Sequence, residues 1–186
     1  MIAMSKAQVR KLIRSRNEGA EARSAQSKLI CCHFLESELY RSSGVIGAFI
    51  PLSWEADILP ILTRTLQDGK TLALPLCDAA PHMTLRRIVS LDDLRPGAYG
   101  IPEPDHQAPI ISVQDVDVIL VPLEGIDRDG RRLGKGGGYY DALLQKSDVT
   151  TVGCALSWQK VNALPSEPWD VRLKWCLDQH GLHCFK

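Results

Sequence analysis

Short, uninterrupted apolar runs recur along this chain and constrain its fold more than any other feature. Val45–Ile50, Thr71–Leu76, Val116–Val121 and Thr150–Leu156 each have the length of a strand and contain few polar side chains. A strand that is apolar on both faces must be buried on both, as in a parallel sheet covered by helices. We therefore predict an α/β fold, a three-layer sandwich that is Rossmann-like and built on a mostly parallel sheet.

Helical patterns fill the intervals between these runs. A capping box at Ser5 predicts a first helix that continues to Arg16. Apolar residues at roughly helical spacing predict a second helix over Ala20–Tyr40 and a third over Asp57–Gln67. A last helix is predicted over Tyr139–Gln145.

The remaining segments are less regular. His82–Val89 alternates apolar and polar residues and predicts a strand with one wet face, whereas Pro96–Pro109 is rich in proline and glycine and predicts a long loop. Val171–Leu177 is the last predicted strand. In such sheets ligands bind beyond the carboxyl ends of the strands. The loops predicted at that position are Pro51–Asp57, Pro122–Gly138 and Ser157–Asp170.

Composition limits the partners of the chain. With 186 residues it has the size of one domain, so we predict a single domain over residues 1–186. Its 22 basic and 22 acidic residues give a formal net charge of zero, which argues against nucleic acid or an anionic membrane as a partner. No apolar run approaches the ~20 residues of a membrane helix, and no targeting signal is evident. We expect small-molecule partners and a monomer.

The cysteines indicate a reducing, cytoplasmic location. The chain has six, and none forms a C-x-x-C pair. Several lie inside apolar runs, as buried free thiols do. Cysteines and histidines also crowd the C-terminus, but their spacing matches no zinc pattern, so we predict no metal there. These residues are Cys176, His180, His183 and Cys184.

The segment Asp127–Asp141 carries the chemistry. Glycines at 134 and 136–138 let backbone N–H groups converge on an anion, and the neighbouring arginines and lysine add positive charge. It is no P-loop, because Gly136 follows Lys135 where Ser or Thr is required. A full dinucleotide fingerprint is also missing. A strand end, a backbone nest and a helix start remain, and they favour phosphate over a plain surface turn.

The same segment, Arg132-Leu-Gly-Lys-Gly-Gly-Gly-Tyr-Tyr-Asp141, is similar to the signature of the 5-formyltetrahydrofolate cyclo-ligase family, the 5,10-methenyltetrahydrofolate synthetases. The resemblance extends over nearly the whole chain, because further motifs of the family occur in the same order. They are Lys6-x-x-x-Arg10, Ser53–Asp57, Gly97–Pro104, Asp117–Pro122, Gly153–Gln159 and Leu164–Asp170. Each is weak alone, and together in this order they are specific.

The resemblance implies a reaction and a fold. The reaction is the ATP- and Mg²⁺-dependent cyclisation of 5-formyltetrahydrofolate to 5,10-methenyltetrahydrofolate, with release of ADP and phosphate. ATP phosphorylates the formyl oxygen, and N10 of the same folate attacks the activated carbon. Such chemistry needs alignment, charge neutralisation and exclusion of water rather than a protein nucleophile. The implied fold resembles that of sugar-phosphate isomerases and CoA-transferases.

The resemblance also implies roles for individual residues. ATP would contact Lys6, Arg10, Arg132, Gly134, Lys135, Gly136, Gly137, Gly138, Tyr139 and Tyr140. The catalytic residues would be Arg132, Lys135 and Tyr139. The folate would contact Glu55, Tyr99, Lys135, Gly136, Gly137, Gly138 and Tyr139. Mg²⁺ would be held by Asp141 and Asp170, since carboxylates suit a hard cation that also takes phosphate oxygens.

Plainer interpretations of these residues stay open. Lys6 and Arg10 could belong to a solvated basic helix, and Asp170 could be a turn residue. Glu55 could be a surface carboxylate instead of a partner for the aminopyrimidine edge of the pterin. Tyr140 could be a buried aromatic residue instead of a flat face for a ligand ring.

The chain departs from the family pattern at three positions. Ile126 stands where phenylalanine is common, and Ala142 where arginine is common. Trp169 replaces the usual histidine or asparagine before Asp170, which removes a polar neighbour of a predicted Mg²⁺ ligand. Two other functions therefore stay in view: a folate- or nucleotide-binding regulator without turnover, and a sugar-phosphate isomerase-like enzyme on the same fold.

Overall fold

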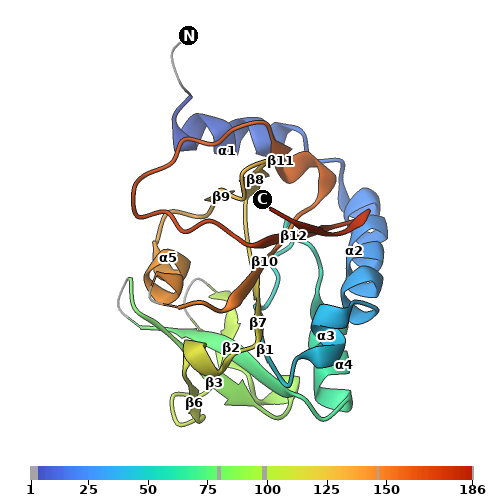
Figure 1. The fold of residues 1–186 in the computed structure, drawn as a ribbon, viewed down its shortest axis with the longest axis vertical. Coiled ribbons are helices and arrows are strands. Elements are labelled where there is room, and N and C mark those ends of the chain that lie inside the picture. Colours follow the sequence, from blue (N-terminus) through green and yellow to red (C-terminus); the bar gives the residue numbers. More distant parts are fainter. Residues whose placement is uncertain (1–3, 79–80, 98–99, 146, 186) are drawn as a thin grey trace.

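One large sheet organises the computed structural model, which describes residues 4–78, 81–97, 100–145 and 147–185 (Figure 1). Within these residues the sheet has eight strands. From edge to edge they are β13 (Gly181–Cys184), β12 (Trp175–Asp178), β10 (Thr150–Cys154), β7 (Val118–Val121), β1 (Val45–Gly47), β2 (Thr71–Cys77), β3 (Met83–Ile88) and β6 (Ile110–Ile111).

The central strands of the sheet are parallel. β12, β10, β7, β1 and β2 pair in parallel, whereas β13, β3 and β6 pair antiparallel toward the two edges. The apolar runs therefore did predict a mixed α/β fold with a mostly parallel sheet. All four residues of β7 are buried, as expected of a strand that is covered on both faces.

Helices lie on both sides of the sheet. In Figure 1, α2 (Ala20–Leu35), α3 (Glu38–Ser42) and α4 (Leu59–Gln67) lie on one side and α5 (Tyr139–Leu144) on the other. Neighbouring strand residues point to opposite cores: Leu120 belongs to the cluster under α2 and α4, and Val121 to the cluster under α5. Helices therefore lie on both faces of the sheet, and in the described part of the chain the short α5 covers the second face. The likeness to sugar-phosphate isomerases stays a prediction.

Two helix boundaries differ from the predicted ones because of local side-chain hydrogen bonds. The helix predicted over residues 20–40 was wrong, because it breaks into α2 and α3. Ser37 caps the second helix by accepting a hydrogen bond from the N–H of Tyr40. The helix predicted from Asp57 begins at Leu59, since the Asp57 carboxylate accepts the N–H of Leu59 and Pro60 occupies the first turn.

The last predicted strand was also partly wrong. It begins at Trp175, not at Val171, and pairs with the unpredicted β13. The preceding residues bond elsewhere: the N–H of Leu173 donates to the carbonyl of Gly130, and that of Val171 to the Asp141 carboxylate. These bonds hold residues 171–173 outside the sheet and against the segment Asp127–Asp141, which we call the glycine-rich segment.

Short strands and turns complete the fold. A second sheet contains β11 (Lys160–Val161), β8 (Gly125–Asp127) and β9 (Arg132–Leu133). The loop predicted over residues 96–109 contains part of a strand pair, formed by β4 (Arg95–Pro96) and β5 (Pro102–Glu103). The 3₁₀ turns described are Leu91–Asp93, Val113–Asp115 and Ser157–Gln159. Among the described residues, no helix is both long and apolar enough to cross a membrane.

The first helix, α1 (Lys6–Ser15), lies across one end of the sheet (Figure 1). Its predicted capping box between Ser5 and Gln8 is confirmed. Val9 and Ile13 bury its apolar face. It approaches β8 so closely that a Cβ on Gly125 would lie 2.5 Å from Cδ1 of Ile13. The glycine thus lets α1 settle beside the glycine-rich segment.

Candidate active site

A cavity of about 880 Å³ opens at the carboxyl ends of β1 and β7, between α1 and α5. Every predicted site residue that the structure describes lines it: Lys6, Arg10, Glu55, Arg132, Gly134, Lys135, Gly136, Gly137, Gly138, Tyr139, Tyr140, Asp141 and Asp170. Tyr99 lies outside the described residues. The position agrees with the rule for ligand sites in parallel sheets.

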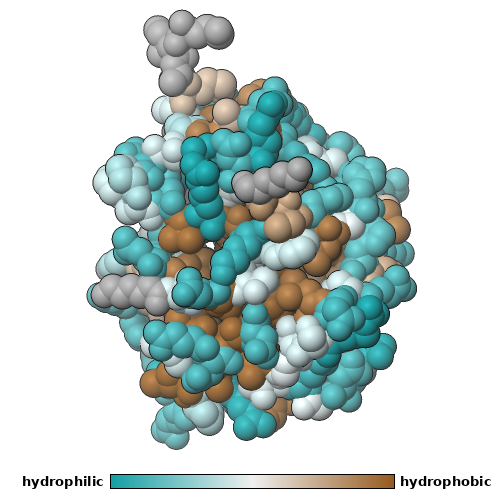
Figure 2. Space-filling model, in the orientation of Figure 1, coloured by the Kyte–Doolittle hydropathy of each residue, from teal (hydrophilic) through white to brown (hydrophobic). Residues whose placement is uncertain are grey.

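Apolar residues form much of the remaining wall. Phe49, Ile50 and Leu52 follow β1, and Pro122 and Leu123 follow β7. On the face drawn in Figure 2, hydrophobic side chains lie in depressions between hydrophilic ones. A cavity that joins apolar walls to a few charged groups is typical of small-molecule sites.

Two basic residues of α1, Lys6 and Arg10, line the cavity. Arg10 donates from Nε and Nη2 to the carbonyl oxygen of Gly134, at 3.0 and 2.7 Å. Lys6, one turn earlier, places Nζ 2.7 Å from Oδ2 of Asp170. Both side chains are only partly exposed, so they face the site and are not free in solvent.

The glycine-rich segment turns sharply before α5. Gly136 and Gly138 have φ of 101° and 70°, in the left-handed region that favours glycine. Arg132, with a side chain 5% exposed, places Nη2 3.0 Å from Oδ1 of Asp141. The same oxygen accepts the N–H of Val171 at 3.0 Å. Because Val171 follows Asp170 in the chain, the two predicted Mg²⁺ ligands are close neighbours.

Glu55 also lines the cavity and is 3% exposed. Its Oε2 accepts the N–H of Leu52 at 2.9 Å, and its Oε1 lies 3.5 Å from Nζ of Lys135. Nζ of Lys135 also lies 5.4 Å from the ring centre of Trp54, in cation–π contact. Burial raises the pKa of Glu55, and the bonds to Leu52 and Lys135 only partly oppose it.

Asp170 has the opposite electrostatic setting. Burial alone would raise its pKa, but hydrogen bonds from Lys6 and from the N–H of Glu167, with the nearby charge of Arg132, lower it overall. Its carboxylate is therefore ionised at neutral pH. An ionised carboxylate is what a divalent cation or a lysine requires.

The acidic residues fit a metal that is shared with a phosphate. No group of three or more His, Cys, Asp or Glu side chains gathers as a ready metal site in the part of the chain that the structure describes. Asp141 and Asp170 both reach the cavity, where Mg²⁺ often takes one or two carboxylates and completes its shell with phosphate oxygens and water. The pair fits that arrangement and not a metal held by protein alone.

The two tyrosines at the start of α5 both line the cavity. The hydroxyl of Tyr140 is buried and has no hydrogen-bond partner among the described residues. Burial raises its pKa, so it stays protonated. A protonated hydroxyl without a partner suits a donor to a bound ligand, because leaving it unpaired costs about 1–3 kcal/mol.

Sequence reasoning missed Glu124. This carboxylate is 6% exposed, lines the cavity, and pairs with Arg14 at 2.8 Å and Arg10 at 3.8 Å. Its position soon after an apolar strand was the signal that could have found it. Trp54 and Trp169 also line the cavity, and Trp169 is 60% exposed, beside the predicted Mg²⁺ ligand Asp170.

Known proteins that are similar to this chain belong to one family. The family model described as "5-formyltetrahydrofolate cyclo-ligase family" matches residues 2–178. A 5-formyltetrahydrofolate cyclo-ligase of Haemophilus influenzae is 29% identical over 147 residues, which cover 76% of this chain and 79% of that protein. One from Mycolicibacterium smegmatis is 30% identical over 147 residues, covering 74% of each.

Solved structures show the same likeness. The 5,10-methenyltetrahydrofolate synthetase of Aquifex aeolicus superposes with a TM-score of 0.85 at 30% identity, over 98% of this chain and 94% of that one. A synthetase of Mycoplasma pneumoniae gives a TM-score of 0.74 at 22% identity, over 95% and 99%, and supports the fold alone.

Proposed function

The chain belongs to the 5-formyltetrahydrofolate cyclo-ligase family and is an enzyme of that family, and from this premise we propose how its cavity works. We propose that it binds ATP with Mg²⁺ beside 5-formyltetrahydrofolate. It then joins N5 and N10 of the folate into a new ring, after phosphorylation of the formyl oxygen. The observation that carries the proposal is the convergence of basic side chains, a glycine-rich turn and a buried carboxylate on one cavity.

ATP occupies the side formed by α1 and the glycine-rich segment. Lys6, Arg10, Arg132 and Lys135 supply positive charge, and the turn through Gly136 supplies backbone N–H groups. Asp141 and Asp170 would hold Mg²⁺, which would neutralise charge on the phosphate oxygens. Charge neutralisation and alignment are the main protein contributions to phosphoryl transfer.

The folate occupies the opposite side. Glu55 accepts hydrogen bonds from the aminopyrimidine edge of the pterin, and Trp54 provides a flat face nearby. Tyr140 donates its unpaired hydroxyl to a ligand oxygen. Tyr99 is included from the family resemblance. Lys135, between Trp54 and the glycines, can reach both ligands.

The reaction then needs two displacements. The formyl oxygen attacks the γ-phosphorus, an O–P bond forms, the bond to the β-phosphate oxygen breaks, and ADP leaves. The N5 lone pair has meanwhile formed a C=N bond, which makes the carbon electrophilic. N10 attacks this carbon, the C=N electrons return to N5, and the N10 proton passes to solvent. N5 then forms the C=N bond again as the C–O bond breaks, and phosphate leaves with the former formyl oxygen. Arg132, Lys135 and Tyr139 border the transferring group.

The two other functions have weaker support. No observation favours an isomerase over the family reaction, and the relatives that share most of the chain are named as cyclo-ligases. The intact charged set at Arg132, Lys135 and Asp141 argues against a binding protein without turnover.

We also propose a monomer in a reducing, cytoplasmic setting. All six cysteines are free thiols, which suits that setting. The formal net charge of zero supports small-molecule ligands over nucleic acid or an anionic membrane.

The formyl oxygen provides the sharpest test. Purified protein is incubated with Mg²⁺–ATP and 5-formyltetrahydrofolate that carries ¹⁸O in the formyl group, and the methenyl chromophore and released phosphate are measured. We expect the chromophore to form only with ATP, and one ¹⁸O atom to appear in each phosphate. Chromophore without label in phosphate would overturn the mechanism. No chromophore from correctly folded protein would overturn the activity.

A further inference from the structure

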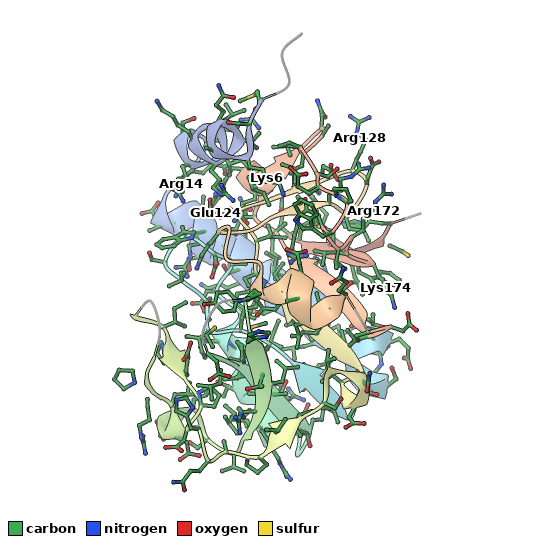
Figure 3. All side chains as sticks on the ribbon, turned by 90° about the vertical axis from the view of Figure 1, so that its left-hand side faces the viewer. Lys6, Arg14, Glu124, Arg128, Arg172 and Lys174 are labelled. Carbon is green, nitrogen blue, oxygen red and sulfur yellow. The ribbon has the colours of Figure 1, made fainter. Side chains whose placement is uncertain are left out.

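Arg14 continues the line of Lys6 and Arg10 along α1. Arg14 is one helical turn beyond Arg10, and its Nη2 lies 2.8 Å from Oε1 of Glu124. Figure 3 shows Arg14 extending from α1 toward Glu124, with Lys6 farther along the same helix. The pair is asymmetric, because the Arg14 side chain is 68% exposed and that of Glu124 is 6% exposed.

The charge on the second carboxylate oxygen of Glu124, Oε2, is only partly balanced. Oε2 is buried and has no hydrogen-bond partner among the described residues. Arg10 forms an ion pair with this oxygen, but its Nε is 3.8 Å away, which is beyond hydrogen-bonding distance. A buried carboxylate is costly unless its charge is balanced, so Glu124 depends on these two arginines.

Arg10 is therefore placed between two acceptors. It donates from Nε and Nη2 to the carbonyl of Gly134, which holds its guanidinium against the glycine-rich segment. A small rotation would let it donate to Glu124 instead. A carboxylate is the stronger acceptor for a guanidinium than a carbonyl is, because the opposite charges also attract each other.

We propose that Arg14 is a positioning residue of the nucleotide site. By neutralising Glu124, it leaves Arg10 on the glycine-rich segment, where Arg10 can meet phosphate. Without Arg14, the buried carboxylate of Glu124 captures Arg10 and withdraws it from the nucleotide. This inference rests on the proposed binding of ATP by Arg10 and adds a residue that no motif of the chain indicated.

The first test is a pair of substitutions. Arg14→Met should raise the Kd for Mg²⁺–ATP, measured by calorimetry without folate, by roughly tenfold, the loss expected for one charge-assisted contact. KM for ATP should rise equally while kcat at saturation changes little. Adding Glu124→Leu in the Arg14→Met background removes the competing carboxylate and should restore most of the affinity. Lys11→Met, which removes an exposed charge from the same helix, is the matched control.

A second variant tests the sign of the effect. Glu124→Gln alone removes a negative charge from the cavity wall and should lower the Kd for Mg²⁺–ATP. A tenfold rise would instead mean that Glu124 holds Arg10 in place, and it would overturn the proposal. This variant removes the buried negative charge itself, so it serves even if Arg14→Met does not fold.

The remaining outcomes also decide. Unchanged affinity in folded Arg14→Met, or no recovery in the double variant, would overturn the role of Arg14. Arg10→Met separates this failure from failure of the proposed function. If Arg10→Met weakens Mg²⁺–ATP and Arg14→Met does not, only the positioning role is wrong. If neither does, the assignment of Arg10 to ATP is wrong as well.

Discussion

The ammonium of Lys135 lies 3.5 Å from the carboxylate of Glu55 in the wall of the cavity. The residue proposed for phosphate thus neutralises the residue proposed for the pterin. If the aminopyrimidine edge binds Glu55 as proposed, Lys135 would lose this partner and could turn to the nucleotide. This contact links the two halves of the site and motivates the first prediction.

Glu55→Gln should weaken folate binding more than catalysis. The amide keeps the shape of the side chain but loses the charge that pairs with the pterin, so we expect KM for 5-formyltetrahydrofolate to rise by about tenfold or more. Steady-state kinetics at saturating ATP measure it. Glu38→Gln, on a side chain 81% exposed, is the matched control. An unchanged folate KM would remove Glu55 from the folate site.

Asp141→Asn should nearly abolish ATP-dependent turnover while the protein stays folded. The amide oxygen can still accept the N–H of Val171, but the charge that faces Arg132, and that would hold the proposed Mg²⁺, is lost. We expect kcat/KM to fall by about 10²-fold or more. Kinetics over a range of Mg²⁺ concentrations and thermal melting provide the measurement. A near-normal rate at limiting Mg²⁺ would show that Asp141 does not hold the metal.

The stability of the protein should depend on pH through Glu55. Its pKa is raised by burial, so the folded protein binds this proton more tightly than the unfolded chain does. The folded state therefore loses stability as pH rises through the ordinary glutamate pKa toward the raised value. Glu55→Gln should increase stability at neutral pH and bring no gain in acid, as urea unfolding at both pH values can measure. A gain that is larger in acid would contradict the assignment.

Asp178 should have the opposite dependence. Its side chain is fully buried, and although burial raises its pKa, hydrogen bonds from Lys160, the N–H of His180 and His183 lower it overall. Its stabilisation is present above the unfolded aspartate pKa and is lost as pH falls through the lower folded value. Asp178→Asn should destabilise the protein at neutral pH and much less in acid. Asp93→Asn, at an exposed position, is the control and should change stability at neither pH. If Asp178→Asn loses as much stability in acid as at neutral pH, the charge of Asp178 is not the cause of the loss.

The sequence was most informative where the signal is local. The apolar run at Val116–Val121 predicted a buried parallel strand, and β7 forms over Val118–Val121, because a strand buried on both faces needs apolar residues at its positions. The glycines at 134 and 136–138 predicted a turn beside a phosphate site for a similar reason: conformational freedom belongs to the residue itself. The motifs around them were sufficient to predict the family, and the family is confirmed.

Only the tertiary structure decided which of these residues meet. Lys6 pairs with Asp170 across 164 positions, and Arg14 with Glu124 across 110. Val171 lies outside the strand that was predicted to include it, because the Asp141 carboxylate on α5 accepts its N–H. A spacing of three or four residues leaves a helical pattern in the sequence, whereas such distant pairs leave none. They form when β7, α1 and the glycine-rich segment converge at one end of the sheet, so their geometry follows from packing.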